Sequence, residues 1–383
     1  MSLQIFVVQI YDYFLNLQAN NFKSGNFTHF FKLRTMEIHF NDLNTIPIFA
    51  TNPFEKKVIQ FVQEWFSDTP TVSVQTSGST GVPKVFEVEK KKMRYSAEMT
   101  CRFLELKHED SALLCLPVEY ISGKMMIVRS IERKLRLHIT EPSLHPLQNL
   151  ETEIDFCAMT PLQVEHSLDK IHLIKKLIIG GAAVSEALKK KINEKLLQRT
   201  ADNEQPTTIV YETYGMSETL SHIALKEIFP NEQQYFQLFQ GVEISQDPRG
   251  CLTINAPQLN SEILQTNDII ELKNTQEFRF LGRADHIINS GGAKIYPEQL
   301  EAIVKKVIPN EVVFLGIPDE RLGQKLILVV EGTKSVVLNE KLSNIHYQPK
   351  FHQPKEIVFV EKIPRTPNGK VNRRALLDFI QNS

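Results

Sequence analysis

Apolar positions follow helical and strand-like spacing in alternation from about residue 50 onward. Behind Thr51-Asn52-Pro53, one helical face collects five apolar residues, namely Phe54, Val58, Phe61, Val62 and Trp65. A capping side chain followed by proline is typical of the first turn of a helix, so we expect a helix to begin here. Segments 71–74 and 84–88 predict strands, and 91–106 predicts a second helix.

The alternation continues through the middle of the chain. Strands are expected at 111–117, 156–159, 177–179 and 208–211, with helices between them, and this order predicts parallel sheets covered by helices. After Gly282, short strands at 312–315, 326–330 and 357–360 surround a helix over 297–307. We therefore expect an α/β fold with a peripheral extension (1–35), a large N-terminal domain of helix-covered sheets (36–282) and a small α/β C-terminal domain (283–383).

Composition and charge narrow the class of protein. Hydrophobic residues make up 42% and charged residues 23% of the chain, and the formal net charge is −1. This balance predicts neither nucleic acid nor an anionic membrane as a partner. No apolar run approaches the length of a membrane span, and the start lacks the features of a signal peptide. The four scattered cysteines read as reduced core thiols, which favours a cytoplasmic setting over a structural zinc site.

Nine consecutive residues are typical of an anion-binding turn: Thr76-Ser77-Gly78-Ser79-Thr80-Gly81-Val82-Pro83-Lys84. Two glycines free the backbone to turn, and successive N–H and hydroxyl groups can bind phosphate. A Walker A loop is excluded because it needs four residues between its glycines. A Ser/Thr/Gly surface turn is the alternative.

Two further segments have the composition of a nucleotide site. Gly180-Gly181-Ala182 follows a predicted strand, where small residues would let a flat ring lie against the backbone; a tight strand–helix turn is the alternative. The segment 211–219, read as one loop, contains Tyr214, Gly215, Ser217 and Glu218. A tyrosine ring can stack on a base, and a carboxylate can help to hold Mg²⁺. Core packing of Tyr214 and a solvated Glu218 are the alternatives.

The C-terminal part contains single polar residues, which have a role only if the preceding segments form a nucleotide site. Asp268, in a loop with Asn267, fits a carboxylate that accepts ribose hydroxyls, and Arg283 would meet ribose or phosphate. Asp285 lies where the two predicted domains join and suits a hinge. The glycine pair before Lys294 (Gly291 and Gly292) allows a close approach to a narrow tunnel. Lys370 lies on a turn near the C-terminus, where a lone lysine is usually solvated.

Taken in order, these segments resemble the motifs of the adenylate-forming enzymes, the family of acyl-CoA synthetases, peptide-synthetase adenylation domains and luciferases. The resemblance runs from about Met36 to the end and includes the phosphate loop, Tyr-Gly-x-Ser-Glu, Gly-Arg-x-Asp and Pro-x-x-x-Gly-Lys. It implies ATP and Mg²⁺ between a large domain, shortened at its N-terminus, and a small mobile one. It also implies that Lys84, Glu218 and Lys370 serve adenylate formation, and that 291–294 approaches CoA, the co-substrate.

Three positions depart from the usual family pattern. Many members have Gly where Asn267 stands, Thr where Ser217 stands and His where Tyr120 stands. The serine keeps the hydroxyl. The asparagine leaves the geometry around Asp268 open, and the tyrosine leaves any gating role open.

The resemblance implies that the substrate is a small-molecule carboxylic acid, and within the family the run 214–223 is most similar to ligases for o-succinylbenzoate. That acid has a second carboxylate, which needs a cation or several donors when buried. The candidates are Ser122, Gly123, Lys124, Arg129, Ser221 and His222. For Lys124 and Arg129 the alternative is a solvated helix face. Ligases for other aryl or acyl acids and an enzyme that loads a carrier protein stay open, as does a homodimer.

Overall fold

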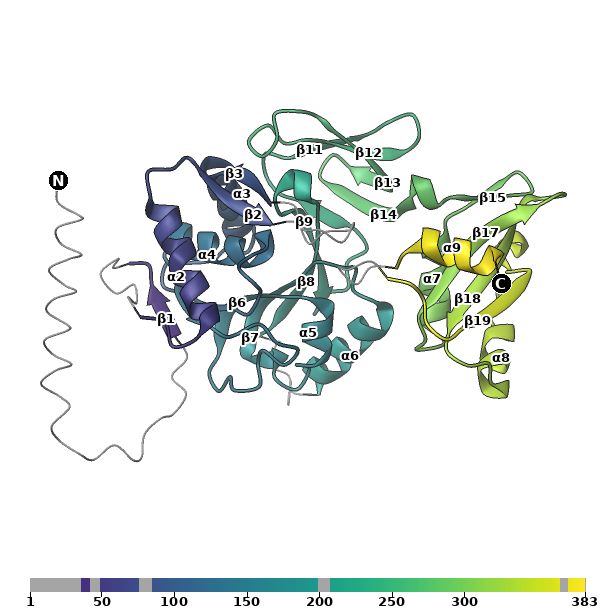
Figure 1. Cartoon of the computed structure of the whole chain (residues 1–383), viewed down its shortest axis with the longest axis horizontal. Helices are drawn as coiled ribbons and strands as arrows, with labels where there is room; N and C mark the ends of the chain where they lie inside the picture. Colours follow the sequence, from purple (N-terminus) through teal and green to yellow (C-terminus); the bar gives the residue numbers. More distant parts are fainter. Residues whose placement is uncertain (1–35, 42–48, 76–84, 199–206, 366–370, 383) are drawn as a thin grey trace, which may run out of the picture. The chain divides into compact units, whose positions relative to one another are not determined.

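The computed structural model describes residues 36–41, 49–75, 85–198, 207–365 and 371–382 (Figure 1). The predicted extension 1–35, the predicted phosphate loop with Lys84, and Lys370 lie outside these described residues. From Met36 to Ser383 the chain forms one compact unit.

Helix α2 (Pro53–Phe66) begins as its sequence predicts. The Asn52 side chain accepts a hydrogen bond from the Glu55 backbone N–H at 2.9 Å. The apolar face of the helix is buried. At the other end, Lys90 Nζ donates to the carbonyl oxygens of Glu64 and Ser67, each at 2.8 Å. A lysine there satisfies carbonyls that have no partner within the helix. Strands β2 (Thr71–Gln75) and β3 (Val85–Glu89) then pair as an antiparallel two-stranded sheet.

The described residues form a large mixed sheet in the order β1-β5-β4-β6-β7-β8-β9-β10-β14-β13-β12-β11. Its strands are β1 (Met36–His39), β4 (Ser111–Leu114), β5 (Arg136–Ile139), β6 (Ile154–Met159), β7 (Ile174–Ile179), β8 (Ile209–Gly215), β9 (His222–Phe229), β10 (Phe236–Leu238), β11 (Glu243–Gln246), β12 (Cys251–Asn255), β13 (Leu264–Asn274) and β14 (Glu277–Arg283). The run β5-β4-β6-β7-β8 is parallel, as expected. From β8 to β11 every pair is antiparallel, and the strand–helix alternation at 111–211 made no prediction for this half. Short connections suffice to join antiparallel strands, and no crossover helix is needed.

Helices cover both faces of the parallel half (Figure 1). Helices α2, α3 (Lys90–Phe103) and α4 (Ile121–Arg133) contribute to one core, and α5 (Pro161–Glu165) and α6 (Glu186–Leu197) to the other. Successive side chains of β6 alternate between them: Phe156 and Ala158 join the first core, Cys157 and Met159 the second. This is the period of two that a strand buried on both faces requires. All four cysteines are buried free thiols, as predicted.

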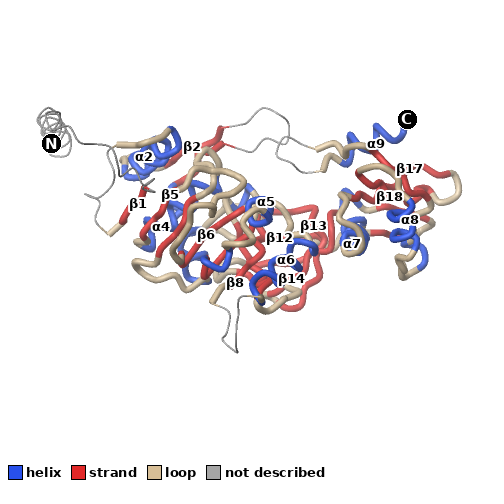
Figure 2. Tube along the Cα trace, turned by 90° about the horizontal axis from the view of Figure 1, so that it is seen from below, coloured by secondary structure: helices blue, strands red, loops and turns tan. Residues whose placement is uncertain are grey.

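A second sheet follows β14 and has its own cores (Figure 2). It consists of β15 (Ile288–Ser290), β16 (Ala293–Ile295), β17 (Val312–Asp319), β18 (Gly323–Glu331) and β19 (Glu356–Val360), with α7 (Pro297–Lys305), α8 (Val336–Ser343) and α9 (Arg373–Gln381) around it. The strands change sheet between Arg283 and Ile288, and the predicted domain boundary and hinge lie at this point. Among the described residues, no helix has the length and apolar character to cross a membrane.

Candidate active site

Strand β8 borders the two halves of the large sheet. It pairs in parallel with β7 and antiparallel with β9. The segment 211–219 is therefore not one loop, because Tyr211 to Gly215 belong to β8 and only Ser217–Thr219 form a short 3₁₀ turn. The content of β-branched and aromatic residues in Ile209–Gly215 favours the longer strand. The carboxyl end of a strand where the pairing pattern changes is a usual place for a ligand in open α/β sheets.

Tyr214 near the end of β8 is both packed and hydrogen-bonded. Its ring lies against Phe236, Phe278 and Phe280, with centroids 5.7, 4.9 and 6.5 Å away. Its hydroxyl donates to Asp268 Oδ2 at 2.5 Å. Burial, and next the charge of Asp268, raise the pKa of Tyr214, so the phenol stays a neutral donor. Core packing thus accounts for these aromatic neighbours, and stacking on adenine stays a prediction.

Asp268 lies in a bulge of β13 rather than in the predicted loop. In the pairing of β12 with β13, Cys251 lies opposite Ile269 and Thr253 opposite Gln265, so three residues face the single residue Leu252. Bulges turn side chains out of the regular alternation of a strand, which explains how a strand residue points to Tyr214 and Arg283.

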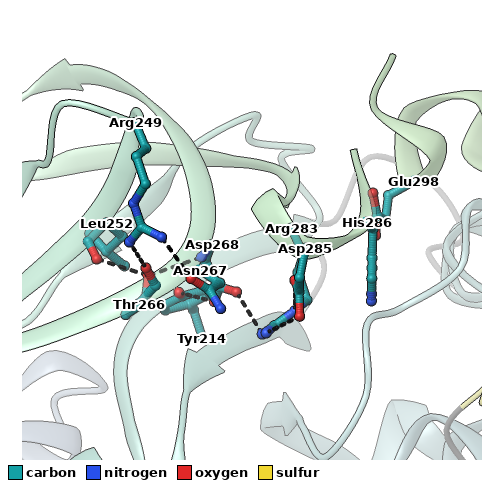
Figure 3. A network of polar contacts seen from close by, with 10 residues as sticks. All are labelled: Tyr214, Arg249, Leu252, Thr266, Asn267, Asp268, Arg283, Asp285, His286 and Glu298. Carbon is teal, nitrogen blue, oxygen red and sulfur yellow. Dashed lines mark hydrogen bonds and ion pairs between the residues drawn. The ribbon is translucent and has the colours of Figure 1, made fainter. Parts of the chain in front are cut away.

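Arg283 connects Asp268 to the predicted hinge (Figure 3). It lies directly opposite Asp268 in the β13–β14 pairing, and its Nη1 donates to Asp268 Oδ1 at 3.2 Å. Its Nε and Nη2 donate to the two oxygens of Asp285 at 2.9 and 3.0 Å. This two-pronged contact lowers the pKa of Asp285. The structure therefore brings four predicted residues together, namely Tyr214, Asp268, Arg283 and Asp285.

A second polar cluster surrounds Arg129 on α4. Arg129 is 2% exposed, so the solvated helix face is the wrong alternative. Its Nη2 donates to Ser221 Oγ at 2.9 Å, whereas its buried Nε has no hydrogen-bond partner among the described residues. Burial lowers the pKa of Arg129 to about 10, which still leaves the guanidinium charged at neutral pH.

His222 extends this cluster to α3. Its Nδ1 lies 3.2 Å from Ser221 Oγ and its Nε2 lies 3.0 Å from Thr100 Oγ1. Burial, and next the charge of Arg129, hold the pKa of His222 well below its usual value. A neutral imidazole between two hydroxyls therefore accompanies the buried cation.

Lys124 is buried as well but faces a different element. Its Nζ lies 4.4 Å from the ring centroid of Phe61 on α2. Burial lowers its pKa, and the nearby carboxylates of Glu64, Glu119 and Glu87 oppose that shift. Lys124 thus already has negative charge around it, whereas Arg129 has none within ion-pair distance in the described part of the chain.

Several predicted glycines have a packing role in the described structure. A Cβ at Gly123 would lie 2.3 Å from Pro117 O, one at Gly180 would lie 2.6 Å from Thr213 Oγ1, and one at Gly215 would lie 2.4 Å from Ser221 O. Gly291 and Gly292 have φ values of +57° and +80° in the two-residue turn between β15 and β16. Such hairpin turns favour glycine without any ligand. Close approach to a base or to CoA is therefore an additional, untested role.

The other predicted residues lie at the surface. Exposed are Gly181, Ala182, Ser122, Ser217, Glu218 and Lys294. The Glu218 carboxylate has no ion-pair partner in the described part of the chain. Mg²⁺ bound with a nucleotide usually takes one or two carboxylates plus phosphate oxygens, so a single unpaired carboxylate fits such an ion. Gln75, the residue before the predicted phosphate loop, donates from its backbone N–H to Glu119 O at 3.1 Å, close to the start of α4.

Comparison with known proteins gives consistent similarities. A model of the AMP-binding enzyme family matches residues 38–244. The 2-succinylbenzoate–CoA ligase of Lactococcus lactis is 26% identical over 377 residues, which covers 88% of this chain and 80% of that protein.

Two solved structures extend the comparison. The acyl-CoA synthetase (AMP-forming)/AMP-acid ligase II-like protein from Dyadobacter fermentans is 33% identical, with a TM-score of 0.62, and the match covers 91% of this chain and 100% of that one. The o-succinylbenzoate coenzyme A synthetase from Bacillus subtilis, solved with ATP and magnesium ion, is 20% identical, with a TM-score of 0.63, and the match covers 79% and 69% of the two chains.

Proposed function

The chain belongs to the AMP-binding enzyme family and is an AMP-forming acid–CoA ligase of that family, and we propose that its acid is o-succinylbenzoate. The product would be o-succinylbenzoyl-CoA, an intermediate of menaquinone biosynthesis. One observation carries this choice: Arg129 is buried and charged, and it has no carboxylate partner among the described residues.

A buried cation without an anion is costly, because the protein interior does not replace the lost hydration. A ligand with a second carboxylate would pair with this cation and offset the free-energy cost of burying it. o-Succinylbenzoate has two carboxylates, so one can be activated while the other meets Arg129 and Ser221. A fatty acid or another monocarboxylate would leave Arg129 unpaired. The name of the Lactococcus lactis relative supports the same choice of acid.

The reaction takes two steps. The carboxylate first attacks the α-phosphorus of ATP, pyrophosphate leaves and an acyl-adenylate forms. The CoA thiol then attacks the acyl carbon, and AMP leaves. We assign Asp268, Arg283 and Tyr214 to the ribose and base of the nucleotide.

Two anions meet in the first step, so the site must supply positive charge. We assign this to the loop 76–81, to Lys84 and to Lys370. Glu218 would hold Mg²⁺, which neutralises phosphate charge when it is bound. Between the steps, the family resemblance implies a rotation at Asp285 that brings 291–294 to CoA.

Exchange of pyrophosphate into ATP across a panel of carboxylic acids tests the proposal. The decisive pair is o-succinylbenzoate and 3-benzoylpropionate, which lacks the ring carboxylate but keeps the reacting one. We expect exchange with the first acid and little with the second. Exchange with fatty or amino acids and none with o-succinylbenzoate would contradict the proposed substrate while leaving the ligase chemistry intact.

The role of Lys370 has a separate test. The substitution Lys370→Ala should abolish adenylate formation because the transferring phosphate loses a cation. Thioester formation from pre-made acyl-adenylate and CoA should stay close to that of the unmodified enzyme. Equal loss in both half-reactions would contradict the assignment.

A further inference from the structure

Regular pairing with β12 cannot hold the bulge that directs Asp268. On the β12 side its three residues, Thr266 to Asp268, face only Leu252, so their backbone groups on that side need other partners. Thr266 supplies some of these: its Oγ1 donates to Leu252 O at 2.8 Å and accepts from the Asp268 N–H at 3.0 Å. The carbonyl of Thr266 and the side chain of Asn267 are held by a residue outside the strand.

That residue comes from a tight turn between β11 and β12. Its sequence, Asp247-Pro248-Arg249-Gly250, has Asp first, Pro second and Gly fourth, as a type I turn favours. The Gly250 N–H donates to Asp247 O at 2.9 Å, and Asp247 Oδ1 accepts from the N–H groups of Arg249 and Cys251 at 2.8 and 3.0 Å. The turn is therefore fixed by its own sequence, and it presents the side chain of Arg249 to the bulge.

The guanidinium of Arg249 joins the turn to the bulge (Figure 3). Its Nη1 donates to Asn267 Oδ1 and its Nη2 donates to Thr266 O, both at 3.1 Å. Its Nε donates to Asp247 Oδ2 at 2.8 Å. A planar fork with several fixed donors can make these contacts together, which a lysine cannot do.

We infer that Arg249 is a positioning residue that fixes the direction of Asp268 for the ribose hydroxyls of the nucleotide. This inference rests on the proposed nucleotide site. It also explains the asparagine at 267, where related enzymes often have glycine, because the Asn267 amide gives Arg249 an acceptor next to Asp268. Arg249 does not touch Asp268 itself and acts through the two residues before it.

A residue that only stabilises the turn and a residue that positions Asp268 differ in one measurable property. Positioning must matter only when the ligand has ribose hydroxyls to present to Asp268. A general weakening of the fold would affect every adenine nucleotide alike. The test therefore compares ATP with 2′,3′-dideoxy-ATP, which has the same base and phosphates but neither hydroxyl.

Isothermal titration of the full chain with both nucleotides measures this difference. We expect Arg249→Ala to weaken ATP binding about five-fold and dideoxy-ATP binding less than about two-fold, as the loss of one partly exposed set of charged hydrogen bonds would give. Arg249→Lys should lie between the unmodified protein and Arg249→Ala. Equal weakening for both nucleotides, or no weakening at all, would overturn the inference.

Two further variants sharpen the result. The matched control is Arg279→Ala, which removes another partly exposed arginine of the same antiparallel half, paired with Glu271 at 2.6 Å; it should leave the affinity for ATP unchanged. Adding Asn267→Gly to Arg249→Ala should cost no further affinity if both side chains act as one unit. Additive losses would overturn that mechanism. Failure of the unmodified protein to bind ATP would contradict the proposed nucleotide site, and with it this inference.

Discussion

Arg283 and Arg129 use the same guanidinium group in opposite surroundings. Arg283 is partly exposed and already contacts two carboxylates, Asp268 and Asp285. Arg129 is buried and contacts a hydroxyl and a thioether sulfur. One region therefore holds a preassembled, charge-balanced network, and the other holds a positive charge that has no anion beside it among the residues that the structure describes.

The difference in charge balance indicates which kind of ligand group each region suits. Exposed ion pairs add little stability, so the network of Arg283 mainly fixes geometry for neutral hydroxyl groups. A buried unpaired cation lowers stability, and a matching anion recovers that loss on binding. We therefore read the Arg283 region as preorganised for a sugar and the Arg129 region as selective for an acid.

The largest effect is expected from Arg129→Met, which removes the buried charge but keeps much of the side-chain volume. The value of kcat/KM for o-succinylbenzoate should fall about 100-fold or more, because a desolvated charge pair loses one partner. The value for 3-benzoylpropionate should stay constant or rise. Steady-state assays with both acids measure the change in preference.

The control for that variant is Lys124→Met, which removes a buried cation that faces Phe61 and the α2 side instead. It should not change the preference between the two acids. Arg129→Met should also be as resistant to urea as the unmodified protein or more so, since replacing a buried ion by an apolar group often stabilises. If Arg129→Met kept the same preference between the two acids, the claim that the Arg129 region selects the acid would be wrong.

The next effect tests the other region. In Asp268→Asn the network loses one negative charge, and Arg283 keeps Asp285 as its partner. We expect ATP to bind about 20-fold more weakly because a charged acceptor of ribose hydroxyls is lost. The affinity for the acid, measured by titration without nucleotide, should not change. A parallel loss of acid affinity would show that the two regions are not separate.

His222, next to Arg129, should make the stability of the folded chain depend on pH. Its pKa is low in the folded chain, first through burial and then through Arg129, whereas in the unfolded chain it returns to about 6.5. The unfolded state therefore binds more protons below about pH 6.5. The contribution of neutral His222 is fully present above that pH and is lost, by up to about 1.4 kcal/mol per pH unit, as the pH falls.

Urea unfolding at pH 7.5 and 5.5 measures this loss. His222→Gln keeps a hydrogen-bonding group near Thr100 but cannot be protonated, so its stability should fall less between the two pH values. His108→Gln, at an exposed position, should behave as the unmodified protein does. The same acid-side loss in His222→Gln would exclude His222 as its source.

The smallest effect is expected from Tyr214→Phe. It removes the hydroxyl that donates to Asp268 Oδ2 and leaves the ring among Phe236, Phe278 and Phe280. ATP affinity should fall about three- to five-fold, in line with one hydrogen bond to a charged group that water can partly replace. Fluorescence or calorimetric titration resolves such a change. A larger loss than in Asp268→Asn would contradict the assigned order of roles.

The sequence predicts β4, β6, β7 and β8 of the parallel half because each contains a short apolar segment and clear helix starts lie between them. Strand β5 was not predicted, because Arg136 and His138 alternate with Leu137 and Ile139. Segments such as 177–179 and the cap at Ser185 belong to this half. Beyond β8, strands such as β11 and β13 are half exposed and rich in polar residues, and the antiparallel half was not predicted. Helix α8 was missed because Val336 and Val337 are exposed and only Leu342 is buried, so no apolar face marks it.

The candidate site also has features that the sequence predicts and features that it does not. The motif segments that contain Tyr214, Asp268 and Arg283 could be listed from the sequence and meet in space. The bulge under Asp268 could not be predicted, because it depends on the register between β12 and β13. Arg249 was missed for the same reason, although its Asp-Pro-Arg-Gly turn is visible in the sequence. The direction of Lys124 toward α2 depends on tertiary packing.

The tight fit at Gly215 has a consequence for the order of events during turnover. Tyr214 precedes Gly215 in β8, and the glycine lies so close to Ser221 that even a methyl group would collide with its carbonyl oxygen. If Ser221 shifts when the acid binds, β8, which contains Tyr214 of the nucleotide site, must therefore shift as well. We expect each substrate to change the affinity of its companion by the same factor, as thermodynamic reciprocity demands.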